Sequence, residues 1–443
     1  MKVVWATYNF FPERVGGTEV YAVNVARHLL GRGHAVHIVA GSTRSAVSPV
    51  EARDTTWENL PVTFVSIRTD RLRWEDLISL ESEELTDWWE KWFREHPSDL
   101  LHVHGHSPVC SVSLLVAAKK AGLPVAVSLH HTELFCSRGD VVTAWGRPCD
   151  GKLRPIRCSL CFGLTKFERL RQAGKTEDKP AATTVPGLAA AGVFGKMRTA
   201  AELPKQFYWK RRSLRRQIAQ VDGWHVFSPE AKRFLLRNGV ADERISIIPH
   251  GVDPIPAQRR ESSSVVRIGY VGRFHAEKGV GLLIRAIDRI PSELPLRFFF
   301  YGQAQDSQEE KVQQEVAALS RRDHRVVLAG GLPPAQTTEV FAGLDLLVIP
   351  SIAFETGPLV ALEAFRSGVP IIAPRWSGFP SMIRDGVNGL LFPWGNAQAL
   401  AGCLQRIGRE PELLRRLADG IQPPASMQVH VQGLLNFYQR LLG

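Results

Sequence analysis

The chain has 443 residues, of which 44% are hydrophobic and 22% are charged, and its formal net charge is +11. This length exceeds what one ordinary core holds, and no apolar run is long enough to cross a bilayer, so the composition predicts a soluble globular protein with two α/β domains. The first residues show no signal-peptide pattern, which predicts a cytoplasmic location. The positive charge favours an anionic partner: a phosphate, a nucleic acid or an acidic membrane surface.

The first half alternates short apolar runs with helical patterns, which predicts a parallel α/β domain. A first strand at 3–7 is followed by a diglycine loop, a helix at about 18–30 and a second strand at 34–40. Later strands are expected at 62–67, 100–104, 125–129 and 223–227. The segment from about 165 to 205 is rich in Gly, Ala and Thr and is expected to be partly mobile.

The second half repeats this scheme, with strands expected at 266–271, 296–301, 326–329, 346–349 and 370–373. A stretch rich in Pro, Ser and Arg at 253–264 is interpreted as a linker. The predicted domains are therefore 1–252 and 265–428. A last helix at 429–443 is expected to pack back on the first domain.

The most informative motif follows the expected strand at 346–349. Glu355 lies on the loop after this strand, and Pro358 suits the first turn of a helix, where a missing N–H is tolerated. Glu363 would then lie about two turns into that helix. Two glutamates at this spacing are usually a solvated helix face, but the strand, the Gly-Pro turn and a basic motif upstream favour a functional pair. The free N–H groups at such a helix start favour an anion such as a diphosphate.

With this motif the sequence resembles the family 4 glycosyltransferases, whose GT-B fold has two Rossmann-like domains with parallel sheets facing across a cleft. The motifs that carry the resemblance follow one another over nearly the whole chain: Gly16-Gly17-Thr18-Glu19, Ser128-Leu129-His130-His131, Ile248-Pro249-His250-Gly251-Val252-Asp253, Gly272-Arg273-Phe274-His275-Ala276-Glu277-Lys278-Gly279 and Gly386-Val387-Asn388-Gly389-Leu390-Leu391. One departure is Gly378-Phe379-Pro380-Ser381, where the family commonly has Glu after Gly-x-Pro.

The resemblance implies a retaining glycosyltransferase of the hexosyltransferase type. It would move a sugar from a UDP-, GDP- or ADP-sugar to a glycan, a lipid-linked glycan or a small molecule, as in polysaccharide biosynthesis. It implies that Arg273 and Lys278 hold the diphosphate, that Glu363 binds the ribose, and that Glu355 and His130 contact the sugar; Glu355, His130, Arg273 and Lys278 form the implied catalytic set. The full implied donor site is Gly16, Gly17, Arg273, Lys278, Glu355, Thr356, Gly357, Pro358, Leu359, Val360 and Glu363.

We find no Asp-x-Asp motif at a strand end, so we expect no catalytic metal. The negative charge of the leaving diphosphate would then be met by Arg273, Lys278 and backbone N–H groups. His102, His104 and His106 alternate along a strand end, but a metal site needs a further ligand and none is evident nearby. We therefore expect His104 and His106, together with His131, to line the acceptor side.

Four of the six cysteines lie close together in the sequence, at Cys136, Cys149, Cys158 and Cys161. The closing Cys-x-x-Cys fits one edge of a tetrahedral thiolate site. The polar loop between the cysteines would be costly to order unless a cross-link, such as a bound metal ion, held it together. We expect structural zinc here, with an iron–sulfur cluster as the second choice. The chain is thus expected to be a subtype with a four-cysteine insertion after the strand-end histidine.

The segment 196–216 carries eight basic side chains and one acidic side chain, with Phe207, Tyr208 and Trp209 among them. A basic helix with interfacial aromatic residues can lie on an anionic membrane, although a charge run is usually a solvated face. Peripheral contact with the inner face of a membrane therefore stays open.

Three alternatives remain: an epimerase or a phosphorylase of the same fold, a zinc-knuckle nucleic-acid-binding protein, and a degenerate transferase kept as a scaffold. The paired glutamates with Arg273 and Lys278 fit transfer best, so no nucleic-acid partner is expected. The sequence does not identify the base, the sugar, the acceptor, the linkage or the oligomeric state.

Overall fold

The structure, a computed structural model, describes residues 1–14, 16–44, 46–68, 81–107, 109–173, 202–253, 263–331 and 337–443. The chain divides into two compact units, which we describe separately. The first unit comprises Met1–Phe227, Ala231–Ile248 and Met427–Gly443, and the second comprises Ser228–Glu230 and Pro249–Ser426. Most of the expected linker and most of the segment expected to be mobile lie outside the described residues.

The first unit is built on an eight-stranded sheet, in which only the edge pair β3 and β4 is antiparallel. In sheet order the strands are β3 (Val50–Trp57), β4 (Leu60–Ile67), β2 (Ala35–Gly41), β1 (Lys2–Thr7), β5 (Leu100–Val103), β6 (Val125–Ser128), β7 (Gly223–Val226) and β8 (Ile245–Ile247). The sequence prediction missed β3 and β8. Strand β3 is largely exposed and polar, so it lacks the apolar run of a buried parallel strand.

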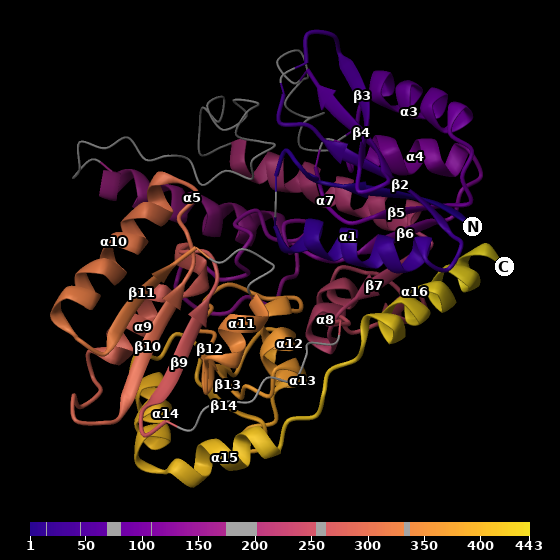
Figure 1. The fold of residues 1–443 in the computed structure, drawn as a ribbon. Helices are drawn as coiled ribbons and strands as arrows, with labels where there is room; N and C mark the ends of the chain where they lie inside the picture. The colour runs from indigo at the N-terminus through magenta and orange to yellow at the C-terminus, as the bar shows by residue number, and fades with distance from the viewer. Residues whose placement is uncertain are drawn as a thin grey trace. The chain divides into compact units, whose positions relative to one another are not determined.

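The described helices of the first unit are α1 (Gly17–Leu30), α3 (Glu83–Glu95), α4 (Val112–Lys120), α5 (Pro155–Ala173), α7 (Glu202–Gln220), most of α8 (Pro229–Arg237) and α16 (Met427–Leu442). A short 3₁₀ turn, η2 (Asp242–Arg244), precedes β8. Helix α16, drawn in yellow in Figure 1, packs against α1 near the other end of the sequence. Its buried residues Val431, Leu434 and Tyr438 share one core with Trp5 and Tyr21, so α16 completes the core of the first unit.

The second unit has a six-stranded sheet in which all neighbouring strands are parallel. In sheet order the strands are β11 (Val326–Gly330), β10 (Leu296–Tyr301), β9 (Val266–Val271), β12 (Leu346–Val348), β13 (Ile371–Pro374) and β14 (Gly389–Phe392). The described helices are η3 (Ala276–Lys278), α9 (Val280–Ile287), α10 (Ser307–Arg322), α11 (Thr337–Ala342), α12 (Leu359–Arg366), α13 (Phe379–Met382), α14 (Ala397–Arg409) and α15 (Pro411–Asp419). Strand β14 was not predicted as a strand; it covers the second half of the motif Gly386-Val387-Asn388-Gly389-Leu390-Leu391.

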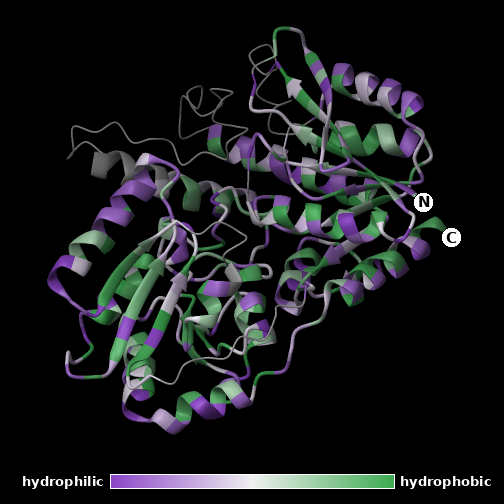
Figure 2. Cartoon of the chain, viewed as in Figure 1, coloured by the Kyte–Doolittle hydropathy of each residue, from purple (hydrophilic) through white to green (hydrophobic). Residues whose placement is uncertain are grey.

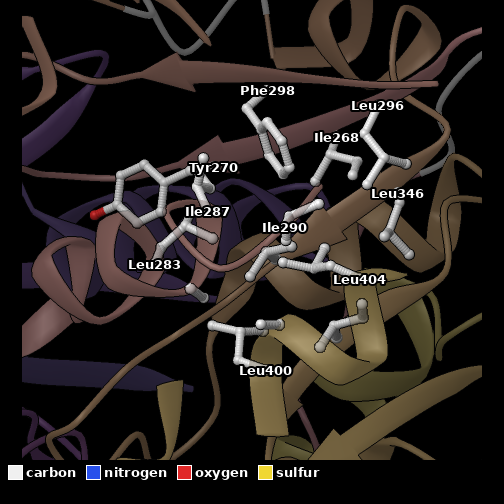
Figure 3. Close-up of a cluster of buried hydrophobic side chains, with 14 of the residues drawn as sticks. Ile268, Tyr270, Leu283, Ile287, Ile290, Leu296, Phe298, Leu346, Leu400 and Leu404 are labelled. Carbon is white, nitrogen blue, oxygen red and sulfur yellow. The ribbon is translucent and has the colours of Figure 1, made fainter. Parts of the chain in front are cut away.

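The second unit has one core between its sheet and helices α9 and α14, and another that includes Phe341 of α11 and Phe365 of α12. Figure 3 shows Ile268, Phe298 and Leu346 from three strands packed against Leu283 and Leu404 from the two helices. Helix α10 carries mainly hydrophilic residues, drawn in purple in Figure 2, and buries only a narrow stripe. The prediction of an α/β fold with two parallel-sheet domains is confirmed, with one antiparallel edge strand added. Within the described residues, we find no helix with the length and apolar character needed to cross a membrane.

Candidate functional site

Arg273 lies on the loop that follows β9 in the second unit, where it forms an ion pair with Glu309 of α10. The Arg273 side chain is 44% exposed, whereas the Glu309 side chain is fully buried. The second carboxylate oxygen of Glu309 accepts a hydrogen bond of 2.9 Å from the backbone N–H of Gln305. Tyr270 lies at the edge of the core with its hydroxyl pointing outward (Figure 3), and this hydroxyl donates to the Arg273 carbonyl at 2.5 Å. Glu309 therefore holds the Arg273 guanidinium and Tyr270 holds the Arg273 backbone, while part of the guanidinium stays exposed to solvent.

Lys278 lies at the end of η3 on the same loop. Its Nζ is 2.7 Å from Oε1 of Glu355, and the Ser351 hydroxyl donates to the same oxygen at 2.8 Å. The two loops are also joined through their backbones, since the N–H of Ile352 donates to the Glu277 carbonyl at 2.9 Å. The structure thus brings together Lys278 and Glu355, which the sequence analysis placed in one site.

Gly279 makes this approach of the two loops possible. Its φ of 75° lies in the left-handed region that favours glycine. A Cβ added there would lie 1.9 Å from the carbonyl oxygen of Pro350, closer than any non-bonded contact allows. The loop that carries Lys278 therefore requires glycine at this position.

Ser377 fixes the backbone of Glu355, and the sequence analysis did not identify it. Its hydroxyl donates to the Glu355 carbonyl at 2.6 Å and accepts from the Glu355 N–H, and the N–H of Gly378 donates to the same carbonyl at 3.0 Å. Ser377 is buried and has a φ of 67°, which is uncommon for a residue other than glycine. The hydroxyl of Ser381, in the segment that departs from the family pattern, donates to the Gly378 carbonyl at 2.8 Å.

Helix α12 begins at Leu359, and Pro358 is its extended N-cap residue rather than part of its first turn. Of the expected donor residues, Thr356 and Gly357 precede this helix, Pro358 caps it, and Leu359 and Val360 open its first turn. Burial raises the pKa of Glu363, on the same helix, to about 7. A carboxyl group with this pKa exists in both protonation states near neutral pH.

The N-terminus of α1 lies in the first unit beside the loop that follows β6. The Thr18 hydroxyl and Nε2 of His131 are 3.0 Å apart, so the diglycine loop at Gly16 and Gly17 lies next to the strand-end histidines. Glu19 is buried and turns back toward Gly16, where an added Cβ would lie 2.8 Å from its carboxylate. Burial also raises the pKa of Glu19. His131 is exposed at this position.

His104 is fully buried, so the expectation that it lines an acceptor surface is wrong. Its Nδ1 is 3.0 Å from Nε2 of the half-buried His130, and its ring packs against Trp5 with centroids 4.4 Å apart. Burial holds the pKa of His104 well below its usual value, and burial with the nearby Lys210 lowers the pKa of His106 to about 3. His104 thus supports His130 from inside the unit, while His106 is only half-buried.

A second set of buried polar side chains, which we call the histidine chain, crosses the sheet of the first unit. It consists of Tyr438, His102, Ser128, His225 and the carbonyl of Ile248, joined by hydrogen bonds of 2.6, 2.8, 2.6 and 2.9 Å in that order. Burial keeps both histidines neutral, so each ring has one donor and one acceptor nitrogen. The Ile248 carbonyl can only accept, so Nε2 of His225 donates to it; Ser128 then donates to His225, His102 to Ser128, and Tyr438 to His102. Their pKa values are lowered by burial and by neighbouring histidines, to about 3 for His225.

The four clustered cysteines lie on the loop after β6 and at the start of α5. The N–H of Ala144 donates to Sγ of Cys161 at 3.2 Å, and the N–H of Arg154 donates to Sγ of Cys158 at 3.3 Å. No group of three or more His, Cys, Asp or Glu side chains in the described part of the chain is arranged to hold a metal ion. All four cysteines are free thiols, as thiolate ligation requires, and the expected zinc or iron–sulfur site stays a prediction.

Comparison with known proteins relates both units to sugar transfer. Residues 15–157 match the family model described as Glycosyltransferase Family 4, and residues 265–410 match the model described as Glycosyl transferases group 1. A D-inositol 3-phosphate glycosyltransferase of Acidothermus cellulolyticus is 27% identical over 235 residues, which cover 48% of this chain and 52% of that protein. One from Nocardiopsis dassonvillei is 26% identical over 445 residues, covering 91% of this chain and 84% of that protein. The chain spans about half of the length, or less, of several other curated relatives that it matches.

The fold is also similar to that of solved structures. A crystal structure of Anabaena Alr3699/HepE in complex with UDP superposes with a TM-score of 0.64 at 16% identity, over 99% of this chain and 100% of that one. At this identity the likeness concerns the fold, which is the GT-B fold expected from the sequence. The sequence of the first unit is thus similar to the Glycosyltransferase Family 4 model, that of the second unit is similar to the Glycosyl transferases group 1 model, and the chain has the GT-B fold.

Proposed function

We propose that the protein transfers a sugar from a nucleoside-diphosphate-sugar to an acceptor, with the donor nucleotide bound by the second unit. The observation that carries this proposal is the group of Arg273, Lys278 and Glu355 after strands β9 and β12, beside the N-terminus of α12. Ligands of open parallel sheets bind at the carboxyl ends of the strands, and two partly exposed cations with a helix N-terminus suit a diphosphate. The solved neighbour that contains UDP supports a nucleotide donor.

In this proposal Arg273 and Lys278 neutralise the charge that develops on the leaving diphosphate. Preorganised donors of this kind are commonly worth about 3 to 4 kcal/mol each in the transition state. Glu363 binds the ribose hydroxyls and Glu355 binds the sugar. His130 completes the catalytic set, and Gly16 and Gly17 belong to the donor-binding residues. We propose that no catalytic metal is needed and that the leaving phosphate helps to deprotonate the acceptor on the same face, so that the anomeric configuration is retained.

The acceptor is assigned to the strand-end groups of the first unit, in particular His106 and His131. The rings of His131 and His130 have centroids 6.4 Å apart, and neither His106 nor His131 is fully buried. The acceptor is a glycan, a lipid-linked glycan or a small molecule. The Acidothermus and Nocardiopsis relatives, by their names, act on D-inositol 3-phosphate, so a phosphorylated polyol should be among the first acceptors tried.

A thermal-shift screen with UDP, GDP, ADP and TDP, followed by their sugars, tests the donor proposal. A ligand that binds only the folded state raises the melting temperature, and Arg273→Ala and Lys278→Ala should reduce this rise without unfolding the protein. No shift with any nucleotide, or shifts in both variants as large as that of the wild-type protein, would contradict the site.

Proton NMR of the first-formed product tests the stereochemistry and should show the same anomer as the donor. Turnover should persist in the presence of a chelator.

Contact with an anionic membrane is proposed for helix α7. Tyr208 is 58% exposed on this helix, and the guanidinium of Arg212 lies 5.2 Å from the centre of the Trp209 ring, while Phe207 is buried in the unit. Co-flotation with anionic liposomes at low salt, and its loss at high salt, would support the contact. Absence of flotation at low salt would exclude it.

A structural metal held by the four clustered cysteines also stays a proposal. It is supported by the N–H groups directed at Cys158 and Cys161 and by the buried ammonium of Lys210 near Cys136, which would balance a negatively charged thiolate centre. The side chains would have to close around the ion. We expect zinc in protein purified without added metal, with its loss in Cys158→Ser and its retention in the control Cys403→Ser. Metal-free, folded wild-type protein that takes up neither zinc nor iron would end this proposal.

The alternative functions are not favoured. Both matching family models and the curated relatives are named as glycosyltransferases, which favours transfer over an epimerase, a phosphorylase or a nucleic-acid-binding protein.

A further inference from the structure

The two cations of the candidate donor site are both paired with glutamates, but the two pairs differ in construction. Glu309, the partner of Arg273, is fully buried and uses both carboxylate oxygens inside the unit. Glu355, the partner of Lys278, keeps 16% of its side chain exposed and belongs to the proposed sugar-binding group. This asymmetry is the basis of an inference that rests on the proposed function.

We propose that Glu309 is a permanent anchor for Arg273, whereas Glu355 is a temporary partner that Lys278 exchanges for the diphosphate of the donor. A pair between a lysine that is 41% exposed and a nearby carboxylate is held weakly in water, and a phosphate offers the ammonium stronger charge-assisted hydrogen bonds. Lys278 can therefore change partners at little energetic cost.

Glu355 would stay in place when Lys278 leaves. Its backbone is clamped by Ser377 and Gly378, and the Ser351 hydroxyl still donates to Oε1. The carboxylate that loses the ammonium would then accept hydrogen bonds from sugar hydroxyls. Binding of the diphosphate thus prepares the recognition of the sugar, and the two events are coupled through one carboxylate.

Arg273 behaves differently in this scheme because its partner cannot turn toward the ligand. The buried carboxylate of Glu309 holds one edge of the guanidinium and leaves the exposed edge for the phosphate. Glu309 is then a positioning residue, and it should contribute to nucleotide affinity even though its charge is unfavourable for an anion.

The test is the sign of the change in nucleotide affinity when each glutamate is altered. We would titrate wild-type protein and variants with the nucleoside diphosphate that gives the largest thermal shift, without a sugar. Glu355→Gln should bind it about threefold more tightly, because Lys278 no longer has to leave a carboxylate. Glu309→Gln should bind it about fivefold more weakly, because Arg273 loses its anchor.

Glu309→Asp separates positioning from charge, since it keeps the carboxylate and shortens its reach. Weaker binding by Glu309→Asp supports the anchor, and wild-type affinity overturns it. If Glu355→Gln binds the nucleotide more weakly than the wild-type protein, or equally tightly, the proposed exchange of Glu355 for the diphosphate by Lys278 is overturned. Failure of the proposed function gives a different result: neither Arg273→Ala nor Lys278→Ala would then weaken nucleotide binding. Melting temperatures of all the variants without ligand identify any that fail to fold.

Discussion

Both units gather polar side chains at the ends of their central strands, but they satisfy these groups in opposite ways. In the second unit, Arg273 and Lys278 are charged, more than 40% exposed and paired with carboxylates. In the first unit, the histidine chain is buried, and burial lowers the pKa values of its two histidines so that their rings are neutral. A charge near water can exchange one partner for another, whereas a buried neutral chain has no alternative partner. The first arrangement suits a ligand site and the second suits a scaffold.

The largest effect is expected at Gly279, where the loop that carries Lys278 packs closely against the backbone of Pro350. Gly279→Ala would force a Cβ against the Pro350 carbonyl at a φ of 75°, so we expect a loss of about 3 kcal/mol or more in stability together with loss of nucleotide binding. The measurement is chemical denaturation combined with the nucleotide titration. As a matched control, Gly402→Ala, in a helix with no atom near the added Cβ, should be neutral or slightly stabilising. Similar behaviour of the two variants would show that the loop is not constrained as described.

Acid should damage the neutral arrangement. His225 has a folded-state pKa of about 3 and an ordinary value of 6.5, so the unfolded state binds more protons below pH 6.5. The contribution of His225 to the free energy of unfolding is therefore fully present above pH 6.5 and decreases as the pH falls toward 3. At pH 5 the loss from this residue is about 2 kcal/mol. Thermal unfolding at pH 7.5 and pH 5 measures the loss. A melting temperature that does not fall would mean that the histidine is not buried in its neutral form.

The end of the histidine chain offers a smaller test. Tyr438→Phe removes one hydroxyl and leaves Nδ1 of the buried His102 without its donor, which should cost about 1 kcal/mol of stability. Urea denaturation of this variant should be compared with Tyr208→Phe, which changes an exposed hydroxyl and should have no effect. If Tyr208→Phe lost as much stability as Tyr438→Phe, the result would argue against the histidine chain.

The smallest expected effect concerns Glu363. With a pKa of about 7, its carboxyl loses its proton as the pH rises from 6 to 8, and the charged form accepts stronger hydrogen bonds from ribose hydroxyls. Nucleotide affinity should therefore rise about threefold over this range, and the rise should disappear in Glu363→Gln. The same rise in both proteins would assign the pH dependence to another group.

The sequence was sufficient where the pattern was local. Strands β9 and β10 were predicted at their observed bounds, because buried parallel strands are continuous apolar runs. The residues of the second-unit site were also visible, since Arg273, Lys278 and Glu355 each follow a recognisable strand. The amphipathic edge strand β3 was missed because it resembles a polar loop.

What the sequence could not reveal were partnerships between distant residues. Glu309 is one polar residue of a charged helix, and only the fold places it under Arg273. Ser377 looks like an ordinary turn residue until its hydroxyl is seen on the Glu355 backbone. His104 was expected at a surface because it ends a strand, but the packing of Trp5 over that strand end buries it. A signal for Glu309 did exist, since a glutamate on the buried stripe of a helix needs a partner.

The place of α16 in the first unit has a consequence for biosynthesis. Residues 427–443 leave the ribosome only after the whole second unit has been made, yet they contribute Tyr438 and Leu434 to the first core. Until they emerge, the apolar residues that α16 covers in the first core lack their packing partners. We therefore expect a chain that ends before residue 427 to expose this apolar surface and to aggregate more readily than the full chain.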